Sequence, residues 1–320
     1  MQRKVAENIR FVNPNCLCGK VDFSIIGVSK KGVHLMNGYK YKPIRFYIIC
    51  FVVTWLFWIS AAILSSFGDE NGISMILMLF GLFTPAVTAI VTVTTSKSKA
   101  LKNDLKRKLV GFYRIKPLNI LIAVLSFALI VVCSILLSLL FGQSADQFAF
   151  TEDFSFSIGG TSALLTILLA SVIEELGWRG YGEDSVASYF TWFTESIIFG
   201  CIWALWHLPL FWIEGTYHYG LRELGIVYML NFLISVVPMG FLTTWVYVRN
   251  NRSMLACIIF HLFVNTMQEK IAMTPQTKCI ETIVVTIAAV IVVMLNKEMF
   301  FERKHIGNIL CEKKGNEELI

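Results

Sequence analysis

The feature that most constrains this chain is a series of long apolar runs whose charges are confined to their ends. A helix that crosses the hydrocarbon core of a bilayer needs about 20 mostly apolar residues. Eight runs approach this pattern, at residues 46–67, 73–95, 118–141, 161–176, 196–213, 224–248, 254–268 and 280–296. The sequence therefore predicts an all-α, polytopic transmembrane helix bundle of about eight spans. The fourth and seventh runs are short and carry charge or histidine.

The composition supports lipid as the solvent of this protein. Of 320 residues, 56% are hydrophobic and 16% are charged, against roughly 25% charged residues in an average soluble domain. The eight cysteines are scattered and include no CxxC pair, so neither a disulfide framework nor a thiolate zinc site is indicated. We expect a multi-pass integral protein, in the plasma membrane.

Basic residues are distributed unevenly among the loops. Residues 1–45 carry nine Lys or Arg and residues 97–116 carry eight, whereas residues 68–72 and 142–160 carry none. Because Lys and Arg concentrate in cytosolic loops, both termini are predicted to be cytosolic. The long basic segment before the first apolar run argues against a cleavable signal peptide. The net charge of +6 thus reflects membrane topology, and basic residues beside a membrane also attract anionic lipid headgroups. We therefore expect membrane lipid, and no nucleic acid, as a partner.

Two adjacent carboxylates and an arginine end the fourth apolar run. Charged groups within a membrane are costly and usually functional. Glu175 and Arg179 are four residues apart, so on a helix they stack and can form an ion pair. Glu174 is rotated by about 100° from Glu175 and is left as the candidate base. The alternative is that both glutamates are wetted residues at the cytosolic end of a span.

Two further apolar runs contain histidine. His207 lies among aromatic residues, with Trp203 one turn earlier and Pro209 two residues later. His261 and Asn265 are also one turn apart and share a helical face. Each group alone is compatible with hydrogen bonding between packed helices. The other histidines (His34, His218 and His305) fall in expected loops or tails, so the two within spans favour a buried site.

With these residues assembled, the sequence resembles the CPBP family of intramembrane proteases, which includes type II CAAX prenyl endopeptidases and Abi-type bacteriocin-immunity homologues. The family motifs EExxxR, FxxxH and HxxxN match in order, and the matching residues are Glu174, Glu175, Arg179, His207, His261 and Asn265. Trp203 stands where phenylalanine is usual. The resemblance implies an intramembrane endopeptidase whose substrate is a membrane-associated peptide or a prenylated protein.

Two mechanisms suit these residues. In the first, Glu174 activates water, His207 orients that water, and His261 with Asn265 stabilises the oxyanion; Glu175, Arg179 and Trp203 orient these groups. In the second, Glu174, His207 and His261 hold zinc, as in a metalloprotease. The sequence lacks an HExxH helix, which is the usual way to present two zinc histidines. It therefore favours water activated by glutamate, with zinc as the alternative cofactor.

The apolar runs, together with the resemblance over about residues 160–270, divide the chain into four parts. Residues 1–45 form a basic cytosolic segment, residues 46–159 hold three scaffold helices, residues 160–272 hold the CAAX-protease-like catalytic core, and residues 273–320 hold the last span and a cytosolic tail. Other classes of protein stay open. A non-catalytic immunity or regulatory scaffold could bind a peptide in the same cavity. A transporter is a second alternative, but the internal repeats expected of a transporter are not visible in this sequence.

Overall fold

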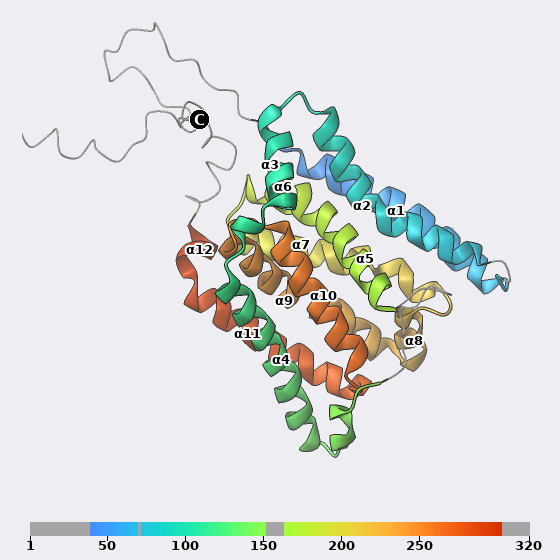
Figure 1. Cartoon of the computed structure of the whole chain (residues 1–320). Coiled ribbons are helices and arrows are strands. Elements are labelled where there is room, and N and C mark those ends of the chain that lie inside the picture. Colours follow the sequence, from blue (N-terminus) through green and yellow to red (C-terminus); the bar gives the residue numbers. More distant parts are fainter. Residues whose placement is uncertain (1–38, 70–71, 152–162, 303–320) are drawn as a thin grey trace, which may run out of the picture.

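The computed structural model describes residues 39–69, 72–151 and 163–302, so most of the predicted amino-terminal segment and cytosolic tail lie outside it. The helices are α1 (Pro43–Ser66), α2 (Ile73–Thr95), α3 (Lys99–Val110), α4 (Pro117–Leu139), α5 (Ala163–Gly177), α6 (Glu183–Ala187), α7 (Trp192–Trp206), α8 (Tyr217–Leu224), α9 (Ile226–Arg249), α10 (Met254–Lys270), α11 (Pro275–Leu295) and α12 (Lys297–Phe301) (Figure 1). No strand occurs in these described ranges. The all-α prediction is confirmed.

The described helices include six that are long and apolar enough to cross a membrane. Within the described residues each of the eight apolar runs is mainly helical. Helix α7 has 15 residues but is extended by the 3-10 turn Leu208–Trp212, whereas α5, with 15 residues, and α10, with 17 residues, are not among the six. These are the two runs that the sequence marked as short. The protein is thus a multi-pass integral membrane protein, whereas the count of eight spans stays a prediction.

The outer face of α1 shows why lipid suits the bundle. Large apolar side chains recur on this face every three or four residues and are exposed: Ile44, Ile48, Val52, Leu56, Ile59 and Ile63. The opposite face is buried, and two of its polar side chains bond to the backbone of α2: Thr54 donates to the Gly81 carbonyl at 3.1 Å. Trp58 donates its indole N–H to the Met78 carbonyl at 2.8 Å, as an environment without water requires.

Glycines allow two pairs of helices to approach closely. A Cβ atom on Gly200 of α7 would lie 2.9 Å from the backbone of Val237 in α9, and one on Gly177 of α5 would lie 2.7 Å from the carbonyl carbon of Pro85 in α2. Both distances are shorter than a side chain tolerates. These glycines therefore set the spacing of the helices that carry the candidate site residues.

The helix that begins with α5 does not stop where its apolar run stops. A π-helical turn at Trp178–Gly182 joins α5 to α6, so helical backbone continues to Ala187. Glu174 consequently lies inside the bundle. The buried Trp178–Gly182 segment is polar enough in sequence to resemble a loop, so this continuation was not predicted.

A buried charge network closes the end of the bundle formed by α3, α6 and α12, which we call the closed end. Asp184 of α6 forms ion pairs with Lys108 of α3 and with Arg252 in the α9–α10 turn. Asp104 joins the network through Arg252 at 2.6 Å and through Lys108 at 3.3 Å. Tyr247 donates its hydroxyl to Asp184 at 3.1 Å. Together these contacts tie three distant segments into one packed layer.

The first and last described helices meet this same layer. The Tyr189 hydroxyl donates to the carbonyl of Tyr41, just before α1, at 2.9 Å. Phe301 of α12 stacks on Phe193 of α7 with ring centroids 4.7 Å apart. Both ends of the described chain thus lie at the closed end, while the location of the termini stays a prediction.

Candidate active site

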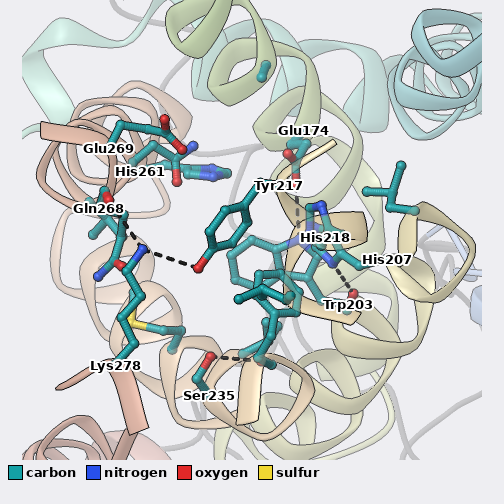
Figure 2. A pocket seen from close by; sticks show the side chains of 18 of the residues that line it. Glu174, Trp203, His207, Tyr217, His218, Ser235, His261, Gln268, Glu269 and Lys278 are labelled. Carbon is teal, nitrogen blue, oxygen red and sulfur yellow. Dashed lines mark hydrogen bonds between the residues drawn. The ribbon is translucent and has the colours of Figure 1, made fainter. Parts of the chain in front are cut away.

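The residues of all three sequence motifs contribute to one cavity of about 270 Å³ between α5, α7, α8, α9, α10 and α11. Its polar or ionisable lining residues include Glu174, Trp203, His207, Tyr217, His218, Asn231, Ser235, His261, Asn265, Gln268, Glu269, Lys278 and Glu281. Figure 2 shows Glu174, His207 and His261 turned toward this space from different helices. Aliphatic and aromatic side chains form the rest of the wall. A mostly apolar cavity with a few converging polar groups is the usual form of a ligand site.

Glu174 has one partner on the cavity wall. The indole Nε1 of Trp203 donates to Glu174 Oε2 at 2.9 Å, and the glutamate is 7% exposed. A phenylalanine, usual at this position of the motif, has no N–H to donate. Trp203 therefore keeps the aromatic bulk and adds a hydrogen bond that fixes one carboxylate oxygen.

Glu175 points away from the cavity and holds two other site residues. Its Oε1 lies 3.1 Å from Arg179 Nη1, which is the ion pair expected from their spacing. The same oxygen lies 2.9 Å from His261 Nδ1 on α10. Arg179 also pairs with Glu183, Nε to Oε2, at 3.1 Å. The two glutamates thus differ in surroundings, since Glu175 serves a buried ion network and Glu174 faces the cavity.

His207 caps the carboxyl end of α7, where Pro209 follows in the 3-10 turn Leu208–Trp212. Its Nδ1 lies 2.7 Å from the Trp203 carbonyl oxygen. A carbonyl only accepts, so Nδ1 carries the proton and Nε2 is the nitrogen left for other partners. The end of the helix at a proline thus turns this ring into the cavity.

Asn265 lies one turn after His261 on α10 and lines the same cavity. Glu174, Trp203, His207, His261 and Asn265 are therefore brought together, while the orienting pair Glu175 and Arg179 lies behind the wall. The placement makes each assigned role geometrically feasible. The roles themselves stay predictions.

Several polar residues of the cavity were not predicted, and three of them matter most for its chemistry. His218, expected in a loop, lies on α8 and stacks on His207 with ring centroids 5.6 Å apart. Tyr217 and Lys278 form the opposite part of the wall, where Lys278 Nζ donates to the Tyr217 hydroxyl at 3.2 Å. The sequence signal for α8 is a strongly amphipathic segment that follows the Thr216 N-cap and lies between two apolar runs. Such a segment predicts a short helix at the surface of the bundle, but it does not predict which residues that helix contacts.

The described residues contain no group of three or more His, Cys, Asp or Glu side chains arranged to hold a metal ion. Glu174, His207 and His261 line one cavity, and in each histidine Nδ1 is engaged with a protein oxygen. This leaves Nε2 of each ring as the atom that could face a metal, so the zinc alternative stays a prediction. We therefore derive no step through a metal.

The cavity runs away from the closed end. From Glu174 and His261 its lining continues to α8, to Gln268 near the end of α10 and to Lys278 near the start of α11. In the other direction the packed residues of the Trp178–Gly182 turn and α6 are buried. The first and last described helices and the cavity opening thus lie toward opposite ends of the bundle.

Comparisons with known proteins agree with the motifs. The model of the family described as type II CAAX prenyl endopeptidase Rce1-like matches residues 159–267, which contain every motif residue. A curated relative named CAAX prenyl protease 2, from Methanococcus maripaludis, is 39% identical over 269 residues, which cover 84% of this chain and 99% of the relative. The chain therefore belongs to the Rce1-like family of type II CAAX prenyl endopeptidases, as the resemblance predicted, and is a membrane protease.

Proposed function

We propose that this protein hydrolyses a peptide bond near the carboxyl terminus of prenylated CAAX substrates, using water activated by Glu174. The observation that carries the proposal is the different placement of the two adjacent glutamates. Glu175 bonds to Arg179 and His261, whereas Glu174 lines the cavity and accepts a hydrogen bond from the Trp203 indole. A carboxylate held in place at a cavity wall is suited to act as a general base.

Activation of water needs one free oxygen on the base. Trp203 occupies Oε2 of Glu174, which leaves Oε1 for a water molecule in the cavity. The Nε2 atom of His207, which accepts when Nδ1 carries the proton, can hold the same water in line with the substrate carbonyl. General-base catalysis typically contributes about 10² to 10⁴-fold to the rate. We expect losses of this size when Glu174 cannot take a proton.

The oxyanion of the tetrahedral intermediate needs donors from another wall. A carboxylate on Nδ1, here Glu175, stabilises positive charge on the His261 ring, so Nε2 can donate a hydrogen bond. The side-chain amide of Asn265, one turn further on α10, supplies a second donor. Loss of one such donor costs on the order of 10² to 10³-fold in rate. Arg179 acts only through Glu175.

The test is cleavage of a prenylated CAAX peptide by the protein purified in detergent, with products identified by mass. We expect turnover by the wild type and by Glu223→Gln, which alters an exposed carboxylate on α8 with a side chain that is 58% exposed. Glu174→Gln and His261→Ala should lose turnover while remaining folded, and Glu174→Gln should unfold at the same denaturant concentration as the wild type. Peptide binding without cleavage by the wild type would instead support the non-catalytic scaffold.

The direction in which the cavity runs determines the side of the membrane from which a substrate must come. A prenylated CAAX protein is made in the cytosol, so the proposed substrate requires the α8 end of the cavity to face the cytosol. The excess of Lys and Arg at the closed end predicts the reverse orientation. Mapping the topology therefore separates a cytosolic prenylated substrate from an exported peptide, including the bacteriocin-related role predicted as an alternative.

A further inference from the structure

Lys278 is a cation within a mostly apolar cavity. Among the described residues that line this cavity, it is the single Lys or Arg. It belongs to the first turn of α11 and lies on the wall across from Glu174 and His207 (Figure 2). None of the catalytic roles proposed above uses it. A charged group in such surroundings needs a function or a strong partner.

The ammonium of Lys278 has two acceptors within the protein. It donates to the Tyr217 hydroxyl at 3.2 Å and to the Gln268 carbonyl at 3.4 Å. A lysine carries three N–H donors, so one donor is left over. Tyr217, which accepts from Lys278, keeps its own O–H as a donor. Two adjacent donors, one of them charged, thus meet at one point of the wall.

We propose that Lys278 and Tyr217 bind the terminal carboxylate of the substrate, so that the enzyme recognises a free carboxyl terminus. This inference rests on the proposed peptidase function and names a specificity site for it. A carboxylate accepts hydrogen bonds from an ammonium and a phenol at once, and such charge-assisted bonds are stronger than those between neutral groups. A peptide amide offers neither the charge nor the second acceptor oxygen.

The separation of this site from the catalytic residues matches a short peptide. Lys278 contacts Gln268, which follows His261 by seven residues on α10, or roughly 10 Å at a rise of 1.5 Å per residue. An extended chain spans at most about 3.5 Å per residue, so three residues also cover roughly 10 Å. In a CAAX sequence three residues follow the prenylated cysteine. A carboxylate at Lys278 would therefore set the bond after that cysteine beside Glu174.

Acidic neighbours limit the attraction of this site for anions. The Glu281 carboxylate accepts a hydrogen bond from Gln268 Nε2 at 2.6 Å and belongs to the same helix face as Lys278. Its negative charge opposes binding of a second carboxylate. The geometry thus predicts opposite effects from two neighbouring substitutions, since loss of Lys278 should weaken recognition and neutralisation of Glu281 should strengthen it.

The experiment compares two prenylated CAAX peptides that differ only in a free or an amidated carboxyl terminus. The wild type should cleave the acid with a kcat/KM about 10- to 100-fold higher than the amide, the range expected for a hydrogen bond to a charged group. Lys278→Met, which keeps the length of the apolar stem, should lose this preference and cleave the amide as the wild type does. Lys278→Arg should retain part of the preference. Lys297→Met, an exposed lysine on α12, is the matched control.

The outcomes separate this inference from the function on which it rests. Equal cleavage of acid and amide by the wild type, or an unchanged preference in Lys278→Met, overturns the carboxylate site and leaves the peptidase standing. A lower KM for the acid in Glu281→Gln, with the amide unaffected, supports the site. Cleavage of neither peptide overturns both proposals. A general loss of activity in Lys278→Met toward both peptides indicates a structural role and also overturns the inference.

Discussion

The buried ion network behind the cavity should be worth far more to the fold than an ion pair of the same chemistry at the surface. Arg179 is fully buried and lies 3.1 Å from both Glu175 Oε1 and Glu183 Oε2. Removing one partner of a buried pair costs about 3–5 kcal/mol, because a charge is left without compensation. We expect Glu175→Gln near the lower value, about 3 kcal/mol, since Glu183 still faces the guanidinium. Arg179→Gln should approach 5 kcal/mol, because it takes the guanidinium away from two buried carboxylates at once.

The surface pair on α8 is the matched control for this comparison. Arg222 Nη2 lies 2.8 Å from Glu223 Oε1, with side chains that are 30% and 58% exposed. Such pairs contribute about 0–1 kcal/mol, so Glu223→Gln should change stability little. Unfolding by titration with a denaturing detergent, followed by tryptophan fluorescence, measures all three variants. If Glu175→Gln unfolds within about 1 kcal/mol of Glu223→Gln, the network does not stabilise the fold as argued.

Three more predictions test the packing, the motif and the chemistry. Gly200→Ala forces a Cβ to within 2.9 Å of Val237 and should destabilise the protein by about 1–3 kcal/mol, whereas Gly220→Ala, with open space around it, should not; thermal unfolding compares them, and equal midpoints refute the close contact. Trp203→Phe removes the indole donor to Glu174 and should lower kcat about tenfold with KM unchanged, so an unaltered kcat would show that the hydrogen bond does not position the base. Prolonged incubation with a chelator, followed by metal analysis, should leave both activity and fold intact, and activity restored only by added zinc would establish the metal-dependent scheme.

Local features of the site were predictable because they depend on spacing along one helix. The apolar runs gave the helices, and the interval of four residues gave the ion pair between Glu175 and Arg179. The same spacing placed Trp203 with His207 and His261 with Asn265. These relations follow from helix geometry alone, and the structure shows each pair on one face.

Contacts between helices were beyond such reasoning. The bond from Glu175 to His261 joins residues 86 positions apart, and no periodic pattern encodes it. The continuation of α5 through Gly177 and Gly182 was also missed, because glycines beside Trp178 and Arg179 resemble a loop when their burial is unknown. Lys278 was not predicted as a site residue for the same reason, because a lysine at the start of an apolar run is typical of the membrane interface.

The most direct test of the central claim is the rate of peptide cleavage when the Glu174 carboxylate becomes an amide of the same shape. Single-turnover cleavage of a prenylated CAAX peptide would be measured for Glu174→Gln and, in parallel, for Glu223→Gln. If Glu174 activates the water, the rate should fall by about 10² to 10⁴-fold for Glu174→Gln at unchanged stability, and not at all for Glu223→Gln. A Glu174→Gln rate within about tenfold of the wild type would contradict this claim, because water would then be activated by another group.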